Sequence, residues 1–180
     1  MEAGKNSYEI GFLNQLINAF WTFLCFAPVV SYWIAIRIDT WFYLFLVSAF
    51  LIGLLPERIL NKCQMSNRRK TYERAGVKLI RKFVQNGDWL NYIRLNRKHI
   101  VINDVGQADK YLKTIAMYER YHWMCFIFFL FTTIHGFVSG YITDGCLIIA
   151  SNILYNVSAI FLEQYNKMTI KQLHGRSIKA

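Results

Sequence analysis

The chain has 180 residues, of which 54% are hydrophobic and 17% aromatic, and it carries a formal net charge of +10. A soluble single domain of this length cannot bury so much apolar surface, so the composition predicts an integral membrane protein. The lysines and arginines lie beside the hydrophobic segments, as topology determinants do, so we expect membrane lipid and no nucleic acid as the partner.

The first hydrophobic segment, residues 13–36, is long enough to cross a bilayer as a helix that Pro28 is expected to kink. Its start carries only Lys5 against Glu2 and Glu9, so we do not expect a signal peptide. The second segment, residues 41–55, begins with Trp41-Phe42-Tyr43, which is typical of a membrane interface. It is shorter than the about 20 residues that a full crossing requires, so either the bilayer thins around it or its polar ends enter the membrane.

A strongly basic segment, residues 57–118, separates two hydrophobic halves of the chain. Hydrophobic residues recur at helical spacing over residues 67–84, which predicts one amphipathic helix. Residues 89–99 repeat this mixture in a shorter form. We expect the helix to lie on an anionic membrane surface, or to bind the phosphates of a donor or an acidic carrier. Its proposed contacts are Arg68, Arg69, Lys70, Lys78, Arg81 and Lys82.

The second half of the chain begins with a capping box formed by Asp104 and Gln107, which predicts a helix from Val105 into the third hydrophobic segment, residues 122–142. A three-residue turn and the fourth segment, residues 146–162, follow. The fold class predicted for this single domain is therefore all-α, with four transmembrane helices in two hairpins and a basic amphipathic helical segment.

The charge distribution predicts the orientation of these spans. Most of the 21 lysines and arginines lie in the basic segment and in the tail, residues 163–180. Positive segments stay on the cytoplasmic side, so we expect both termini inside and a multi-pass protein of the inner (plasma) membrane. The oligomeric state is not set by any of these patterns.

Polar residues at the edge of the third segment suggest chemistry. Glu119 and His122 share a helical face, so the carboxylate can orient the imidazole as a general base. The same residues also suit an interfacial belt of aromatic and polar side chains. In the fourth segment, Asn152, Asn156 and Glu163 fall on one stripe, either as interhelical hydrogen-bonding residues or as the lining of a pocket.

Other candidate chemistry is weaker. His135 lies deep in the third segment and is expected to be structural. The four cysteines have no metal-binding or redox spacing, and we expect no metal site and no bound cofactor.

Three motifs carry a family resemblance: Glu119-Arg120-Tyr121-His122-Trp123 opening a hydrophobic segment, Asn156-Val157 inside the next, and Gln164-Tyr165-Asn166-Lys167 just after it. Together they resemble the glycosyl-4,4'-diaponeurosporenoate acyltransferase family, which consists of small membrane enzymes of carotenoid glycolipid synthesis. The likeness covers roughly the second half of the chain and a turn at Leu55-Pro56.

The resemblance implies transfer of a fatty acyl group to a sugar hydroxyl of a lipid-linked glycoside. Its matching positions are Glu119, His122, Asn156, Tyr165 and Asn166. We expect direct transfer from acyl-CoA or acyl carrier protein as co-substrate, with His122 as the general base.

In this mechanism Glu119 orients His122, and Asn156 and Tyr165 donate hydrogen bonds to the oxyanion. Asn152, Glu163 and Asn166 would complete the substrate site. Two other functions also fit the sequence: a non-enzymatic subunit of a membrane complex, and a small membrane methyltransferase. An elongated acyl-sized tunnel reaching His122 would favour acyl transfer, an adenosine-sized cytoplasmic pocket would favour methyl transfer, and the absence of any cavity would favour a subunit.

Overall fold

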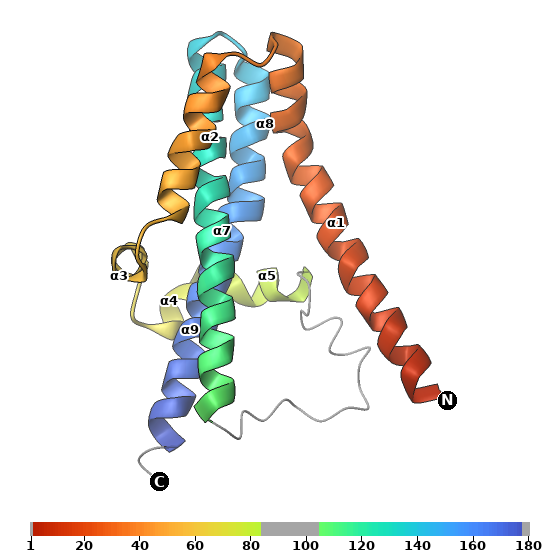
Figure 1. Cartoon of the computed structure of the whole chain (residues 1–180), viewed down its shortest axis with the longest axis vertical. Helices are drawn as coiled ribbons and strands as arrows, with labels where there is room; N and C mark the ends of the chain where they lie inside the picture. Colours follow the sequence, from red (N-terminus) through yellow and green to blue (C-terminus); the bar gives the residue numbers. More distant parts are fainter. Residues whose placement is uncertain (1, 84–104, 178–180) are drawn as a thin grey trace.

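The computed structural model describes residues 2–83 and 105–177, and every regular element within these ranges is a helix (Figure 1). Three long helical runs lie along the molecule: α1 (Glu2–Ile36), α7 (Val105–Val138), and the run formed by α8 (Ile142–Asn152), η2 (Ile153–Val157) and α9 (Ser158–Ser177). The all-helical fold is therefore confirmed for the described part of the chain. The expectation for residues 89–99 lies outside the described residues.

Three helical stretches are long and apolar enough to cross a membrane: Gln15–Ile36, Ala108–Val138 and Ile142–Gln172. The second hydrophobic segment is different. Helix α2 (Thr40–Gly53) has 14 residues, and across the short break at residues 54–56 the chain bends by 95° into α3 (Glu57–Leu60) and η1 (Asn61–Cys63). This pair is either a broken span or a re-entrant loop, so the helices support three or four crossings.

The start of α2 is fixed by its cap. The Asp39 carboxylate accepts hydrogen bonds from the backbone N–H groups of Trp41 (2.9 Å) and Phe42 (3.3 Å), which have no partner within the helix. At its other end, Gly53 lies against Met124 of α7, and a side chain at this position would displace the thioether. Helix α2 thus packs along α7.

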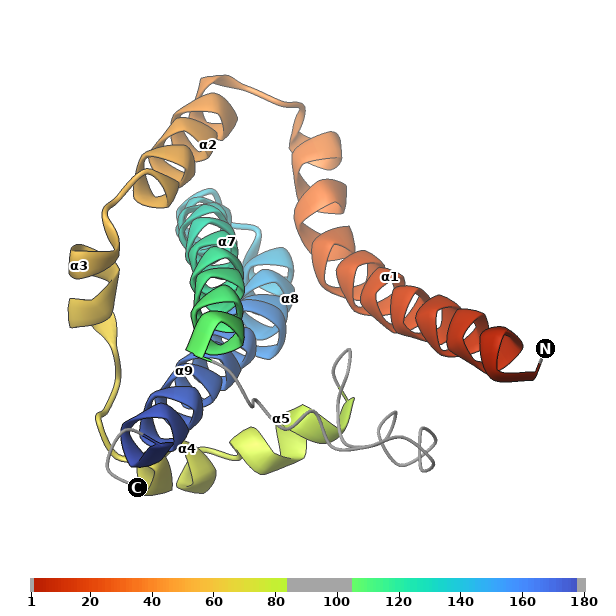
Figure 2. The same ribbon diagram turned by 60° about the horizontal axis from the view of Figure 1, so that its bottom comes forward.

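The chain passes from α2 through α3 to α4 (Arg69–Arg74) around one side of α7 and α9, whereas α1 lies on the other side (Figure 2). The prediction of one helix over residues 67–84 is wrong. Gly76 has a φ of +84°, a left-handed conformation that glycine adopts freely, and it separates α4 from α5 (Val77–Phe83). Two short helices therefore replace the long one.

The third predicted segment does begin inside a helix that starts at Val105, as expected. Its end differs from the prediction. Gly140 has a φ of +84°, its N–H donates to the Phe137 carbonyl (3.2 Å), and the Tyr141 N–H donates to the Gly136 carbonyl (2.8 Å). This Schellman motif ends α7 before the predicted turn. Asp144 consequently lies in the first turn of α8, where the helix dipole favours a carboxylate.

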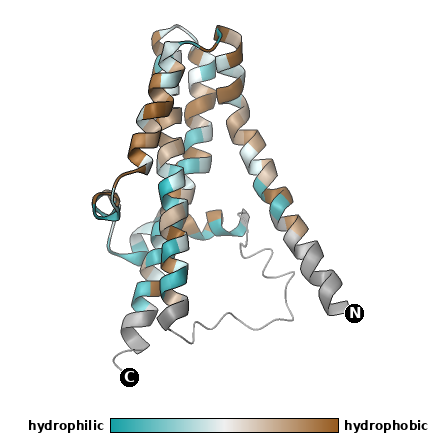
Figure 3. Cartoon of the chain, in the orientation of Figure 1, coloured by the Kyte–Doolittle hydropathy of each residue, from teal (hydrophilic) through white to brown (hydrophobic). Residues whose placement is uncertain are grey.

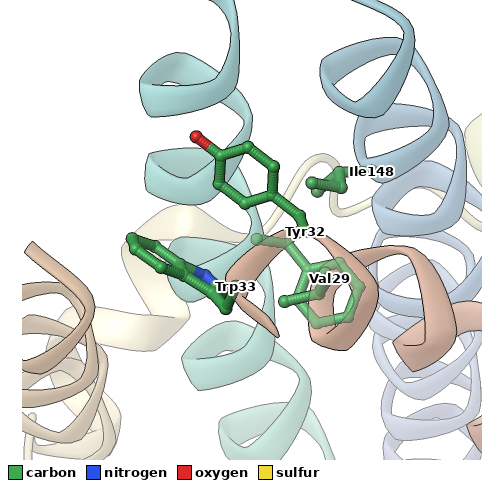
Figure 4. Close-up of a cluster of buried hydrophobic side chains, with 5 residues drawn as sticks. Val29, Tyr32, Trp33 and Ile148 are labelled. Carbon is green, nitrogen blue, oxygen red and sulfur yellow. The ribbon is translucent and has the colours of Figure 1, made fainter. Parts of the chain in front are cut away.

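Hydropathy divides the molecule along its length (Figure 3). Hydrophobic residues dominate α2 and the halves of α1, α7 and α8 near the interhelical turns, whereas α4, α5 and the opposite ends of α7 and α9 are more hydrophilic. The apolar half contains an aromatic cluster from three helices (Figure 4). It consists of Val29, Tyr32, Trp33, Phe129 and Ile148.

Hydrogen bonds stabilise the polar atoms of this aromatic cluster. The Trp33 indole N–H donates to the Thr132 hydroxyl (3.2 Å), and the Tyr32 hydroxyl lies 2.6 Å from His135 Nδ1. The His135 ring also stacks on Trp33, with 5.3 Å between ring centroids. His135 is thus a packed structural residue, as the sequence predicted.

Candidate functional site

The hydrophilic half contains a polar network centred on Glu119, whose side chain is buried where α7 meets α9. Gln164 Nε2 donates to Glu119 Oε1 (2.9 Å), and Lys167 Nζ forms an ion pair with Glu119 Oε2 (3.1 Å). Only 4% of the Glu119 side chain and 9% of the Lys167 side chain are exposed. Each charge is therefore stabilised by the other, because a buried charge without its partner would lower the free energy of unfolding.

The network extends from α9 to the segment that wraps around it. Gln164 Oε1 accepts from the Tyr72 hydroxyl (3.0 Å) and from the Met65 N–H (3.1 Å), and Lys167 Nζ also donates to Asn61 Oδ1 (2.6 Å). Burial desolvates the Tyr72 phenol and raises its pKa, so it remains a neutral donor. We call Glu119, Gln164, Lys167, Asn61 and Tyr72 the polar network.

The expected hydrogen bond between Glu119 and His122 is not made in the described part of the chain. The Glu119 carboxylate bonds to Gln164 and Lys167, whereas His122 Nδ1 lies 3.3 Å from Asn156 Oδ1. The physical reason is that the Lys167 charge attracts the carboxylate toward α9. The two residues belong to separate networks, and a catalytic role for either stays a prediction.

The hydrogen bonds of His122 form a chain with one direction. The Phe126 backbone carbonyl can only accept, and it accepts from Asn152 Nδ2 (3.1 Å). Asn152 Oδ1 then accepts from Asn156 Nδ2 (2.9 Å), which leaves Asn156 Oδ1 as the acceptor facing His122 Nδ1. The proton of a neutral imidazole is thereby assigned to Nδ1, and Nε2 keeps its lone pair.

This hydrogen-bonding chain assigns Asn156 a different role from the one expected. Its amide N–H donates to Asn152, and its carbonyl oxygen faces His122. Asn156 therefore orients the imidazole, and one of the two N–H groups of its amide is already engaged by Asn152. Asn156 also lies in η2, a π-helical turn, and such turns frequently occur at functional sites.

Tyr155 connects His122 with an apolar groove on α1. The Tyr155 ring lies edge-on to the imidazole, with 5.2 Å between centroids, and its hydroxyl lies 3.2 Å from Thr22 Oγ1 of α1. Thr22 is also the first residue of an apolar groove of about 730 Å³ that follows α1 to Ala35. Phe26 lines it and packs edge-on against Tyr155.

Tyr165 lies in a different place from the one its proposed role requires. Its hydroxyl accepts hydrogen bonds from Arg69 Nε (2.8 Å) and Nη2 (2.5 Å) and lies 3.4 Å from Glu73 Oε1. Tyr165 is nine residues beyond Asn156, which is an axial distance of about 14 Å at 1.5 Å per residue. The structure thus brings Tyr165 to α4 and not to His122.

Glu73 connects the two short basic helices. Lys78 Nζ and Arg69 Nε each lie 3.1 Å from its carboxylate oxygens. The hydrogen bond from Lys78, aided by the charges of Lys78 and Arg69, lowers the pKa of Glu73.

The apolar face of the basic helices is largely covered by α9. Tyr72 and Val77 are buried against Leu162 and Met168, while Leu79 stays 61% exposed. Among the predicted anionic contacts, Arg68, Arg69, Lys70, Lys78 and Lys82 are exposed and Arg81 is half-buried with a partner. Arg69 and Lys78 are engaged by Glu73, so Arg68, Lys70 and Lys82 are the exposed basic side chains that remain available to anions, although the helices are anchored on the protein.

The remaining predicted residues, Glu163 and Asn166, are half-buried on α9. Sequence reasoning gave no role to Gln164, Lys167, Asn61 and Tyr72, and it did not connect Thr22 with Tyr155. Gln164 and Lys167 are three apart and on one helical face, a signal that they act together. The partners in residues 61–72 have no such signal, because only the fold brings them to α9.

A comparison with known families gives a match over most of the chain. The model of the family described as glycosyl-4,4'-diaponeurosporenoate acyltransferase matches residues 56–176. This range includes α7, the α8 to α9 run up to residue 176 and the whole polar network, but not α1 or α2. No curated protein and no solved structure matches the chain.

Proposed function

Because the chain belongs to the glycosyl-4,4'-diaponeurosporenoate acyltransferase family, we propose that it moves a fatty acyl group from a thioester donor to a hydroxyl of a lipid-linked or glycosylated acceptor. The observation that carries the proposal is the one-directional hydrogen-bonding chain from the Phe126 carbonyl to His122. This chain supports His122 Nε2 as a proton acceptor, and Tyr155 links the imidazole to Thr22 at one end of an apolar groove.

The proposed reaction is direct transfer. His122 Nε2 takes the proton of the acceptor hydroxyl while the hydroxyl oxygen attacks the thioester carbonyl carbon. The tetrahedral intermediate then collapses, an ester C–O bond remains, and the C–S bond breaks. The imidazolium returns its proton to the departing thiolate, so the histidine ends neutral and no acyl-enzyme forms.

In this proposal the acyl chain binds in the groove along α1. From Thr22 to Ala35 the helix rises about 20 Å, which suits an extended long acyl chain. Phe26 and Val30 offer it apolar surface, and the Thr22 end lies toward Tyr155 and His122. An apolar groove that follows one helix favours an acyl donor over the adenosine group of a methyl donor.

The donor's anionic part would contact the exposed basic residues of α4 and α5. Phosphates of acyl-CoA and the acidic surface of acyl carrier protein are both attracted by this charge. Glu119 then acts indirectly, because its ion pair with Lys167 holds α7 against α9 beside the hydrogen-bonding chain of His122.

We further propose a plasma-membrane topology of four crossings, with α2, α3 and η1 together forming the second. Both termini and the basic helices would then be cytoplasmic, because the positive charge lies there. Single cysteines replacing Asp39 and Asp144 in a background without the native cysteines test this arrangement. Labelling of either position only after the inner face is exposed would contradict it.

The decisive test measures acyl-lipid formation by the purified protein from a long-chain thioester. His122→Ala should lower the rate by about 10² to 10⁴ fold, because the general base is lost. His135→Ala is the matched control, since this histidine packs in the aromatic cluster and should affect stability more than turnover. A folded and fully active His122→Ala protein would rule out the mechanism.

A further inference from the structure

Arg120 and Trp123 stand out on α7 because both have polar atoms without partners. They lie three residues apart and so share a helical face. The Arg120 Nε and Trp123 Nε1 atoms are buried, and neither has a hydrogen-bond partner in the described part of the chain. Adjacent Glu119, in contrast, is fully engaged by α9.

Both unpartnered groups are donors. A guanidinium and an indole N–H cannot accept hydrogen bonds, so neither can satisfy the other. A buried donor without an acceptor costs free energy, which a ligand rich in anionic oxygen atoms would recover. The fork of a guanidinium matches the oxygen atoms of a phosphate especially well.

The position of the pair also suits a charged group. Met124, the neighbour of Trp123, packs against Gly53, where α2 ends before the 95° bend into α3. Arg120 lies one turn from this contact, toward the hydrophilic end of α7. Arginine and tryptophan together at the edge of a span are typical of a membrane interface, where phosphate groups are concentrated.

We propose that Arg120 and Trp123 form a phosphate-binding site on the face of α7 near the end of α2. The guanidinium binds the phosphate oxygen atoms by charge-assisted hydrogen bonds, and the indole N–H adds a second contact. The phosphate belongs either to an anionic lipid headgroup or to the coenzyme A part of a soluble donor. The site does not depend on acyl transfer, because binding requires neither His122 nor a reaction.

The experiment titrates two probes into the purified full-length protein in detergent. Phosphatidylglycerol is the lipid probe, with phosphatidylcholine as its zwitterionic reference, and bound lipid is counted by native mass spectrometry. Coenzyme A without an acyl chain is the soluble probe, with binding measured by calorimetry. Whichever probe loses affinity on substitution of Arg120 identifies the source of the phosphate.

Arg120→Gln should weaken binding of that probe by about tenfold or more, since a charge-assisted contact is lost. Trp123→Phe should have a smaller effect, because it removes only the indole N–H. Lys113→Gln is the matched control: it removes the same charge from an exposed position of α7 and should leave affinity within about twofold. Arg120→Lys keeps the charge and should retain partial affinity.

Equal affinity of the wild type, Arg120→Gln and Trp123→Phe for both probes would overturn the site. An equal loss in Lys113→Gln would also overturn it, because the effect would then be general surface charge. If Arg120→Gln does not fold, Arg120→Lys and Trp123→Phe decide by the same criterion. Loss of acyl transfer with intact binding would count against the proposed function and not against this site.

Discussion

The aromatic cluster and the polar network hold opposite halves of α7 against the neighbouring helices by different interactions. The aromatic cluster packs Phe129 of α7 against α1 and α8 with rings and aliphatic side chains. The polar network fixes Glu119 of α7 by an ion pair and directed hydrogen bonds to α9 and residues 61–72. A packed cluster loses stability according to the cavity that a substitution opens, whereas a buried charge that loses its partner is left without compensation.

This difference bears on function. Lipid tails are as apolar as the aromatic cluster, so the cluster contributes through close packing and not through exclusion of water. The polar network lies closer along α7 to His122 and requires particular residue types. We therefore expect the half with the polar network to govern activity and the half with the aromatic cluster to govern stability alone.

The largest effect should follow from Lys167→Met. It leaves the Glu119 carboxylate buried without its counterion, which costs about 3–5 kcal/mol of unfolding free energy. The measurement is reversible unfolding in detergent, together with acyl transfer at a temperature where the variant stays folded. The double variant Glu119→Leu with Lys167→Leu is the control, and it should be more stable than Lys167→Met. Equal stability of Lys167→Met and the wild type would show that the pair contributes little.

A slightly smaller effect is expected in the aromatic cluster. Ile148→Ala opens a cavity beside Tyr32 and Trp33 and should cost about 2–5 kcal/mol. The folded variant should retain its acyl transfer rate, because the cluster lies away from the polar network. Leu147→Ala, at a neighbouring position that is 52% exposed, is the matched control and should lose less. Loss of activity in folded Ile148→Ala would remove the functional contrast between the two halves.

The smallest effect concerns pH. Hydrogen bonding by Lys78 lowers the pKa of Glu73, so its contribution to docking α4 and α5 is present above the ordinary carboxyl pKa of 4.5. This contribution is lost as the pH falls through the lowered value. Hydrogen exchange of α4 and α5 should therefore become faster, relative to α9, on acidification below pH 4.5. Glu73→Gln should show the faster exchange already at neutral pH. Exchange of α4 and α5 at the wild-type rate in this variant at neutral pH would contradict the prediction.

Several features of the fold followed from local patterns. Hydrophobic runs of sufficient length predicted helices, and the capping residues near Val105 predicted where α7 begins. The end of α7 was missed because Gly140 was not considered as a helix terminator, although glycine favours that position. Gly76 likewise lay inside the predicted amphipathic helix, and its left-handed backbone divides that helix in two.

The candidate site was foreseen only in part. The motif with Glu119 and His122 was found from spacing, and His122 does lie beside Asn156. The pairing of Glu119 with His122 was wrong, because a shared helical face does not determine which neighbouring helix each side chain contacts. Tyr165 and Asn156 belong to two motifs of the same family resemblance and were expected at one site, whereas the fold directs Tyr165 to Arg69.

The sequence by itself determined the helical class, the membrane character and the family, because these depend on composition, local periodicity and short motifs. Only the tertiary structure decided the partners. Lys167 neutralises Glu119, and the Phe126 carbonyl sets the direction of the hydrogen bonds that reach His122. Such contacts join residues that are distant in the chain. Each polar atom has several possible partners, and the rotation of the helices against one another decides which partner it contacts.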